Sequence, residues 1–561
     1  MDNKMHEKQK GNYAYWLLLG ILAVLILSIA ILSSVPPVSK DALVHHLAVP
    51  KLYLKHGGMY EIPFMPFSYY PMNLDLLYLI PLYFGNDIIP KFIHFSFALL
   101  TGWLLFRYLR RRINLRFALF GVIFFLSIPI IVKLSITVYV DLGVIFFSTA
   151  SLLLLFEWIE SRFKLRFLIL SAVSCGLALG TKYNALVTFF LLTLFVPFIY
   201  ARLDRGVRPS FMGSVKMALI FCFVSLIIFS PWMIRNAHWK KNPIYPLYDG
   251  WFNPQKIAAE GPDSDEDDRG GGLGLFTFRH AIYGEKGWEM ALLPIRIFFE
   301  GEDGNPQYFD GRLNPFILLF TILAFFRLRE DPQNIRNEKV ICLAFAVLFF
   351  TFAFFSSPMR VRYISPILPP LVILSTMGVK KALDRVKAFK EPWTKGMGYG
   401  LILLFVGAAL AYNAHYIWDQ FRYVNPFNYL NGDLSRDDYI SRYRPEYPAV
   451  KYINQHLPPD SLVLFLFIGN RGYYCDKNYR PGEDLLGPVF ARSHSAADIL
   501  RNLEDLGVTH LFVYFDLFNK WVDINLDEQK KSILNEFYIK HTRVLFNKNI
   551  FSVLNLEGPS S

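Results

Sequence analysis

Residues 15–35, YWLLLGILAVLILSIAILSSV, form an uninterrupted apolar run that is long enough to cross a bilayer. A few residues later, positions 38–50 read VSKDALVHHLAVP and contain Asp41. A secretory signal peptide has a shorter apolar core and a small-residue cleavage site, so we expect the run to stay as a membrane helix. A carboxylate directly after a first spanning helix is unusual in a plain anchor. It suggests a reactive group at the membrane surface.

The composition is that of a membrane protein. Of the 561 residues, 53% are hydrophobic and only 19% are charged, against roughly 25% in soluble domains. The net charge of +12 does not indicate a nucleic-acid partner, because the basic clusters lie in short loops between apolar runs. The four cysteines form no CxxC motif and no disulfide framework. A zinc site at Asp41, His45 and His46 is conceivable, although the spacing matches no standard ligand set.

Apolar runs of roughly 17–25 residues predict about eleven membrane-spanning helices. The expected spans are residues 14–35, 87–107, 117–134, 136–158, 165–181, 183–200, 214–233, 313–328, 339–357, 361–380 and 397–418. The fold class is therefore a polytopic α-helical membrane protein, with a transmembrane domain at 1–418 that includes two long loops, 36–86 and 234–312.

Basic residues give the orientation of these spans. They precede the first span and follow the second, fourth, sixth, eighth and tenth: Lys4, Lys8 and Lys10; Arg107, Arg110, Arg111, Arg112 and Arg116; Arg162, Lys164 and Arg166; Arg202, Arg205 and Arg208; Arg327, Arg329, Arg336 and Lys339; Lys380, Lys381, Arg385, Lys387 and Lys390. Because Lys and Arg accumulate in cytoplasmic loops, we expect the N-terminus in the cytoplasm. The two long loops and everything after about residue 419 then lie on the outer side of the cytoplasmic membrane.

The outer regions differ in character. Loop 36–86 predicts two short interfacial helices, interrupted by Pro63, Pro66 and Pro71. Loop 234–312 contains an acidic, glycine-rich stretch at 261–272, which we interpret as a solvated loop or, alternatively, as a lid over a substrate.

Residues 419–561 predict an extracytoplasmic α/β domain. Strands are expected at 462–467 and 509–514, helices at 496–506 and 528–541, and a closing pair of strands at 543–554.

Several charged residues lie at the outer ends of the spans: Lys133, Asp141, Lys182, Arg235, Arg360 and Arg362. Each cation alone is explained by snorkelling to the headgroups, and Asp141 alone by an ion pair with Lys133. Their convergence on one side is harder to explain, since Lys and Arg are usually depleted there. An acid with basic neighbours at a lipid–water boundary suits a lipid phosphate, with cations holding the phosphate and a carboxylate acting as base.

A series of motifs follows the same order along the chain. They are the Asp41 segment with Pro50-Lys51-Leu52-Tyr53, Ser68-Tyr69-Tyr70-Pro71, Tyr139-Val140-Asp141, Gly176-Leu177-Ala178-Leu179-Gly180-Thr181-Lys182-Tyr183, Pro231-Trp232-Met233-Ile234-Arg235-Asn236 with Asn242-Pro243-Ile244-Tyr245-Pro246, and Arg362-Tyr363 running into Pro366 and Pro369. In this order, over roughly residues 10–420, the set resembles the GT-C glycosyltransferases. The bacterial branch akin to protein O-mannosyltransferases and the lipid A aminoarabinose transferase is the most similar.

The resemblance implies an inverting glycosyltransferase in the bacterial inner membrane. Its donor would be a polyprenyl-phosphate sugar, and its acceptor a lipid, glycan or protein at the outer face. The expected roles are as follows: Asp41 is the catalytic base; Asp141 orients the acceptor or a cation; Lys182, Arg235, Arg360 and Arg362 bind the donor phosphate; His45, His46, Tyr69 and Tyr183 line the pocket. Many relatives have a second acidic residue after the first-loop aspartate, whereas this chain has Ala42. We therefore expect transfer without a metal ion or another cofactor.

Three other functions are alternatives to this one. A transporter or flippase for a polyprenyl-linked sugar would use the same cations, but it would be expected to break its helices near the membrane midplane. A polysaccharide polymerase or ligase would be expected to use arginine and histidine and not an aspartate after the first span. A non-enzymatic scaffold leaves the outer charges unexplained.

Overall fold

The computed structural model describes residues 2–203, 211–254, 275–354 and 359–557, which form two compact units. The membrane unit comprises Met1–Ser34, Tyr69–Leu77 and Ile89–Pro426. The outer unit comprises Val35–Ser68, Tyr78–Ile88 and Phe427–Ser561. The segment that follows the first helix, including Asp41, is therefore part of the same unit as the C-terminal region.

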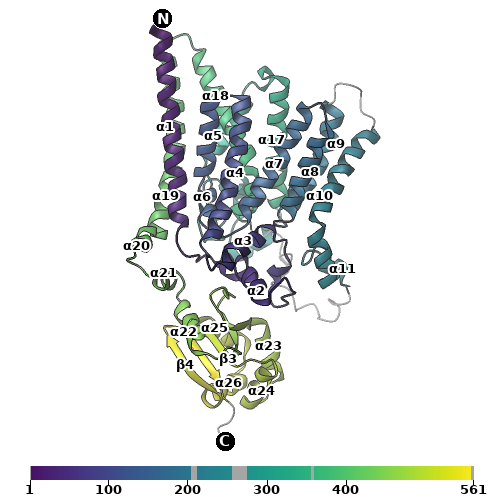
Figure 1. Ribbon diagram of the computed structural model, residues 1–561, viewed down its shortest axis with the longest axis vertical. Coiled ribbons are helices and arrows are strands. Elements are labelled where there is room, and N and C mark those ends of the chain that lie inside the picture. Colours follow the sequence, from purple (N-terminus) through teal and green to yellow (C-terminus); the bar gives the residue numbers. More distant parts are fainter. Residues whose placement is uncertain (1, 204–210, 255–274, 355–358, 558–561) are drawn as a thin grey trace. The chain divides into compact units, whose positions relative to one another are not determined.

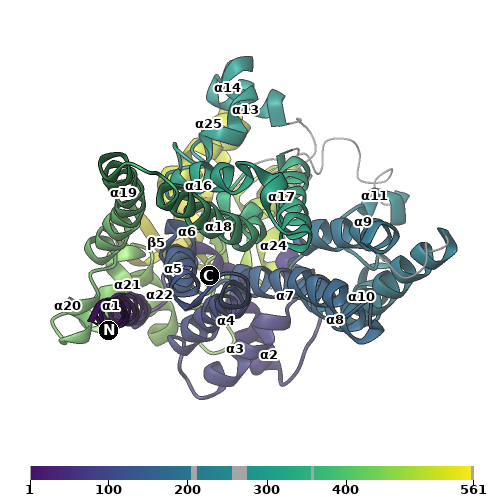
Figure 2. The ribbon, with the colours of Figure 1, turned by 90° about the horizontal axis from the view of Figure 1, so that it is seen from above.

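Helices of very different lengths make up the membrane unit (Figures 1 and 2). They are α1 (Asp2–Ser33), α4 (Ile89–Arg112), α5 (Leu115–Ser127), α6 (Pro129–Ser135), α7 (Asp141–Glu160), α8 (Leu165–Leu179), α9 (Ala185–Leu203), α10 (Phe211–Lys240), α16 (Phe316–Phe325), α17 (Gln333–Phe354), α18 (Leu368–Lys387) and α19 (Pro392–Val424). Shorter elements include α11 (Asp249–Phe252), α13 (Leu275–Tyr283), α14 (Gly287–Ala291), α15 (Leu293–Arg296), η3 (Leu328–Glu330) and η4 (Val361–Ile367).

Each expected span overlaps a helix, but fewer helices than expected are long enough to cross a membrane. Within the described ranges, seven helices have the required length and apolar character, or eight if α5 and α6 count as one bent span. Helices α8 and α16 are apolar but shorter. A polytopic helical protein is thus confirmed, and the number eleven stays a prediction.

Two expected spans differ from the structure near Pro129. Residues 117–134 are not one straight helix: α5 and α6 meet at an angle of 67°. Ile128 leaves the helical conformation with a ψ of 130°, and Pro129 begins the next helix because its missing N–H is not needed there. The following helix begins at Asp141 and not at residue 136, so Asp141 is in the first turn of α7.

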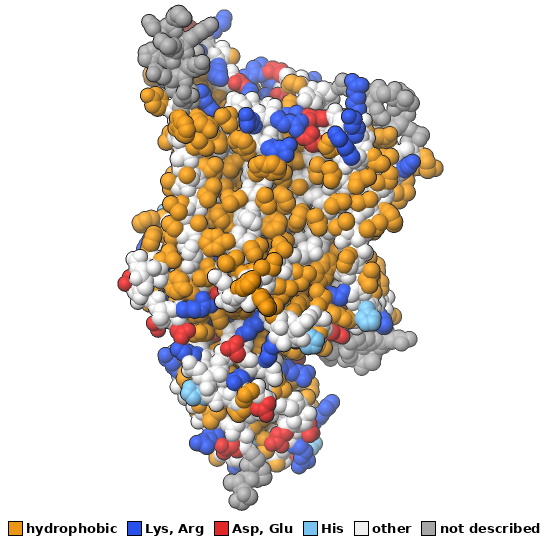
Figure 3. All heavy atoms as spheres, viewed as in Figure 1, with side chains coloured by type: hydrophobic (Ala, Val, Ile, Leu, Met, Phe, Trp, Pro, Cys, Tyr) orange, Lys and Arg blue, Asp and Glu red, His pale blue; other side chains and the backbone are white. Residues whose placement is uncertain are grey.

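Hydrophobic side chains cover the sides of the membrane unit, and Lys and Arg gather at one end (Figure 3). Arg111 is paired there with Glu157 and Glu160, and Arg112 with Glu160 and Glu338. These pairs join α4, α7 and α17 at the end that the basic loops predict to be cytoplasmic.

The outer unit contains short helices and one sheet. Its first segment has a single π-helical turn, η1 (Ala42–His46), followed by α2 (Ala48–His56) and η2 (Pro66–Tyr69), while α3 (Asn73–Tyr83) spans the boundary between units. The C-terminal part contains α20 (Pro426–Leu430), α21 (Arg436–Tyr443), α22 (Tyr447–His456), β1 (Leu462–Leu466), β2 (Asn478–Pro481), α23 (Glu483–Arg492), α24 (Ala496–Asp505), β3 (His510–Tyr514), α25 (Phe515–Asn525), α26 (Glu528–His541), β4 (Thr542–Lys548) and β5 (Phe551–Leu556).

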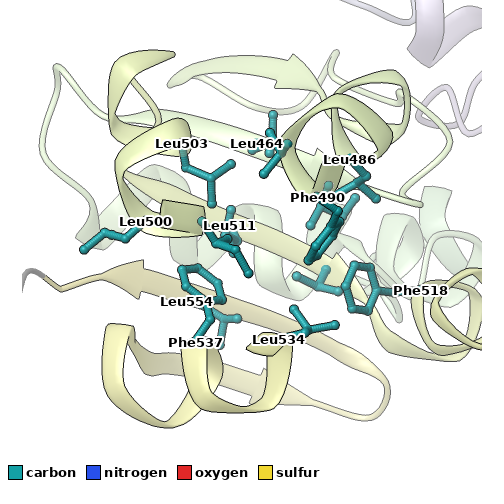
Figure 4. Close-up of a cluster of buried hydrophobic side chains, with 14 of the residues drawn as sticks. Leu464, Leu486, Phe490, Leu500, Leu503, Leu511, Phe518, Leu534, Phe537 and Leu554 are labelled. Atoms are coloured by element: carbon teal, nitrogen blue, oxygen red, sulfur yellow. The ribbon is translucent and has the colours of Figure 1, made fainter. Parts of the chain in front are cut away.

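Among the described residues, five strands form a sheet with the order β2-β1-β3-β5-β4. β1 is parallel to β2 and β3, whereas β5 is antiparallel to β3 and β4. Because side chains alternate along a strand, the sheet supplies two cores. Leu464, Leu511 and Leu554 pack with α23, α24 and α26 on one face (Figure 4). Val463 and Phe512 pack with α22 on the opposite face.

The strands expected at 462–467 and 509–514 correspond to β1 and β3, and the helix expected at 528–541 is α26. The expectation missed β2, whose sequence Asn478-Tyr479-Arg480-Pro481 is short and has one apolar position before its proline. The acidic stretch 261–272 lies outside the described residues.

Candidate functional site

Asp41 lies in the outer unit, immediately before the π-helical turn η1. The turn is closed by the Leu47 N–H, which donates to the Ala42 carbonyl at 2.9 Å. Single π turns are rare and are often found at functional sites. The Asp41 residue is half-buried.

The two histidines follow within the same turn. Their rings lie 4.0 Å apart between centroids, and the His45 ring stacks on Phe67 at 4.5 Å. His46 is buried. The structure thus brings the histidines together next to Asp41, as the sequence spacing requires.

In the membrane unit, Asp141 forms an ion pair with Lys182. The Lys182 Nζ donates to Asp141 Oδ1 at 2.8 Å, and the Asp141 residue is only 3% exposed. Asp141 is in the first turn of α7, where the helix dipole stabilises a negative charge. Its other carboxylate oxygen, Oδ2, is buried without a hydrogen bond among the described residues. Lys133, the partner considered from the sequence, contacts other carboxylates instead.

Arg362 completes this group of charges. Its guanidinium lies over the rings of Tyr139 and Tyr363, at 5.2 and 5.3 Å from their centroids. Lys182 also lies over Tyr363, at 5.5 Å. Both cations thus lie over the Tyr363 ring, and Lys182 also pairs with the buried Asp141.

Lys133 and Arg360 belong to a neighbouring network. Lys133 pairs with Asp303 at 3.1 Å and with Asp310 at 3.0 Å, and Arg360 lies 3.8 Å from Asp310. Burial alone would raise the pKa of Asp310. Lys133, the Gly304 N–H and Arg362 lower it by more than burial raises it, so the pKa is below its ordinary value. The sequence did not indicate Asp303 or Asp310, because the loop that carries them has no regular pattern.

Arg235 is hydrogen-bonded to the backbone. Its Nη2 donates to the carbonyls of Tyr69 and Tyr70 at 2.6 and 3.1 Å, and its guanidinium lies 4.5 Å from the Trp232 ring. Asn236 donates to the same Tyr69 carbonyl at 2.8 Å and to the Tyr183 hydroxyl at 3.1 Å. Arg235 and Asn236 therefore both bind the Tyr69 carbonyl, and Asn236 also binds the Tyr183 hydroxyl, so Arg235, Tyr69 and Tyr183 lie close together.

His94 is a further residue that sequence reasoning missed. Its Nε2 accepts the Leu142 N–H at 3.0 Å, while its Nδ1 lies 3.0 Å from the Thr137 carbonyl and donates to it. The histidine thus fixes the start of α7 and the position of Asp141. An ionisable residue within an expected membrane span is a signal that could have identified it.

No metal centre is indicated within the described ranges: they hold no cluster of three or more His, Cys, Asp or Glu residues arranged for a metal ion. The cationic group at Lys182 and Arg362 suits an anion instead, since a phosphate accepts charge-assisted hydrogen bonds from both side-chain types.

Comparison with known proteins agrees with this architecture. The model of the family described as "Dolichyl-phosphate-mannose-protein mannosyltransferase" matches residues 84–234. No curated protein sequence gives a significant match.

Solved structures match nearly the whole chain. ArnT from Cupriavidus metallidurans bound to undecaprenyl phosphate has a TM-score of 0.55 at 15% identity, covering 97% of this chain and 99% of that one. The Archaeoglobus fulgidus oligosaccharyltransferase tethered with an acceptor peptide has a TM-score of 0.52 at 11% identity, covering 97% of this chain and 74% of that one. At these identities the likeness concerns the fold. The expected resemblance is confirmed at the level of the fold, and the family model supports it over residues 84–234.

Proposed function

We propose that this GT-C-fold chain is an inverting glycosyltransferase that moves a sugar from a polyprenyl-phosphate donor to an acceptor at the outer face of the bacterial inner membrane. The observation that supports this most is the group of Lys182 and Arg362 around the buried Asp141. ArnT, which shares the fold, is described as bound to undecaprenyl phosphate. In the proposed orientation the N-terminus is cytoplasmic and the C-terminal domain is extracytoplasmic.

The proposed reaction is a single displacement. The acceptor oxygen attacks the anomeric carbon and loses its proton to the Asp41 carboxylate, while the bond between the anomeric carbon and the phosphate oxygen breaks. The lipid phosphate leaves with the bonding electrons, and cations stabilise its charge. One displacement inverts the anomeric configuration.

Lys182 and Arg362 are the proposed phosphate ligands, with Asp141 orienting Lys182. Arg360 would add positive charge from its place beside Asp310. We assign Arg235 to the same donor region, where its backbone hydrogen bonds hold Tyr69 and Tyr70 in place. His45, His46 and Tyr183 are proposed to line the acceptor side.

The test uses the full chain in proteoliposomes with an undecaprenyl-phosphate sugar and a membrane extract as the acceptor source. Release of undecaprenyl phosphate is measured, so the acceptor need not be known. We expect Asp41→Asn to lower turnover about 100-fold or more, to a small residual rate, and Asp433→Asn, which changes an exposed aspartate of the outer unit, to leave it unchanged. Undiminished release by Asp41→Asn would remove the assigned base.

The same assay tests whether the transfer needs a metal ion. Because Ala42 stands where relatives have a second carboxylate, turnover should persist in EDTA. Mass spectrometry of lipids and surface glycans from a deletion strain would then identify the sugar and the acceptor.

A further inference from the structure

The backbone on both sides of Asp41 is hydrogen-bonded to one segment of the C-terminal domain. The Tyr474 hydroxyl donates to the Pro37 carbonyl at 2.8 Å, four residues before Asp41. The Tyr473 N–H donates to the Leu43 carbonyl at 3.1 Å, two residues after it. All of these residues belong to the outer unit. Asp41 therefore lies between two anchored backbone positions.

Lys51 makes three hydrogen bonds between the segment that carries Asp41 and the C-terminal domain. Its Nζ donates to the carbonyls of Tyr473 at 2.7 Å and Cys475 at 3.0 Å, and to Asp476 Oδ1 at 2.7 Å. An ammonium group has three N–H donors, so all three are used. Lys51 is thus committed to holding the 473–478 segment and is not available for a phosphate.

Further contacts extend this connection. Lys55 donates to the Asp476 carbonyl at 3.2 Å and to Asn478 Oδ1 at 3.0 Å. The Tyr473 hydroxyl donates to Asp87, which also pairs with Arg436. A domain that only covered a neighbouring surface would not need so many contacts along the six residues 473–478. Most of these contacts are directional hydrogen bonds.

Packing supports the same connection. Phe64, from the segment that carries Asp41, packs against the core on the α22 face of the sheet. The 35–68 segment is therefore built into the C-terminal domain by both apolar and polar contacts.

We propose that the C-terminal domain is a positioning element for the catalytic base: the 473–478 segment holds the backbone on both sides of Asp41 and so fixes the direction of its carboxylate. This inference rests on the role of Asp41 proposed above. Proton abstraction needs a base within hydrogen-bond reach of the acceptor hydroxyl, and a displacement of about 1 Å can lower the rate about 100-fold. Lys51, Tyr473 and Tyr474 are then positioning residues.

Two variants of the full chain test this in the proteoliposome assay. Lys51→Met removes three hydrogen bonds, and Tyr474→Phe removes one without changing the shape of the ring. We expect kcat to fall about 10-fold or more for Lys51→Met and less for Tyr474→Phe, with the donor KM within two-fold of wild type. Tyr479→Phe is the matched control: its hydroxyl is buried without a hydrogen bond among the described residues, so kcat should not change.

Non-additivity separates positioning from general stability. If Lys51 acts through Asp41, then adding Lys51→Met to Asp41→Asn should not lower the residual rate further. A merely structural role would lower that rate again.

The Cys475 thiol reports directly on the 473–478 segment. It is buried, and burial raises its pKa to about 11, so maleimide should label it slowly in the wild type. Lys51→Met should raise this rate about 10-fold, as measured on the Cys475 peptide by mass spectrometry. Wild-type kcat in Lys51→Met, with faster labelling, would overturn the inference. If Asp41→Asn itself turns over normally, the proposed function fails instead.

Discussion

The Lys182 ammonium donates a 2.8 Å hydrogen bond to the Asp141 carboxylate, joining the residues after α8 to the first turn of α7. This contact fixes the direction of a lysine that would otherwise be flexible. It also leaves the other N–H donors of the ammonium able to reach a phosphate.

Lys182→Ala should weaken donor binding. A charged hydrogen bond contributes about 1.5–3 kcal/mol, so we expect the donor KM to rise roughly 10- to 100-fold. Asp141→Asn should raise it less, because the lysine remains but loses its orientation. Lys216→Ala, which removes an exposed lysine of α10, is the control. A donor KM unchanged in Lys182→Ala would exclude Lys182 as a phosphate ligand.

Gly180→Ala should disturb the same site by steric overlap alone. The backbone at Gly180 has a φ of −69°, which alanine adopts without strain, but a Cβ there would lie 2.3 Å from the Asn73 amide nitrogen. Asn73 also accepts a hydrogen bond from Trp232, so it cannot move freely. We expect a lower Tm and a raised donor KM. Gly396→Ala, with open space around its Cβ, should show neither effect.

Asp310 should make stability depend on pH in the acid range. Its pKa in the folded protein is below the ordinary value of 3.8, so its ionised form is favoured by folding. The contribution is present above pH 3.8 and is lost as the pH falls through the lower, folded-state pKa. Asp310→Asn should therefore lower the Tm at pH 7, and its difference from wild type should shrink below about pH 4. A difference that stays constant down to pH 2.5 would contradict this.

Glu338 joins α17 to α4 at the basic end of the membrane unit. It is buried, accepts from the Tyr108 hydroxyl at 2.6 Å and pairs with Arg112. Glu338→Ala removes the acceptor of the buried Tyr108 hydroxyl, while Arg112 keeps Glu160 as a partner. Leaving a buried polar group without its partner costs about 1–3 kcal/mol, so Glu338→Ala should lower the Tm in detergent. Glu504→Ala, at an exposed helical position, is the control.

The sequence predicts most of the helices, because a run of about 20 apolar residues has few alternatives to a spanning helix. The predicted helix boundaries were wrong between Ile128 and Asp141. The residues on both sides of the bend are apolar, so the composition does not show where the helix breaks. The start of α7 depends on His94, which is distant in the sequence and binds the Leu142 N–H.

The sequence does not predict which charged side chains form ion pairs. Asp141 is nearer in sequence to Lys133, yet it contacts Lys182. The packing of α7 against α8 brings Asp141 and Lys182 together. Lys133 instead meets Asp303 and Asp310, from a loop whose backbone course has no periodic signal. Sequence alone identified which residues carry charge at the outer ends, but the tertiary packing selects their partners.

The 35–68 segment obtains several of its hydrogen bonds from residues that are synthesised much later. Lys51 and Asp476 are separated by 425 positions, and Lys51 and Tyr473 by 422. While the ribosome is still producing the middle of the chain, residues 35–68 lack these hydrogen bonds to the 473–478 segment. Residues 35–68 are therefore expected to reach their final conformation only after residues 427–561 have been synthesised.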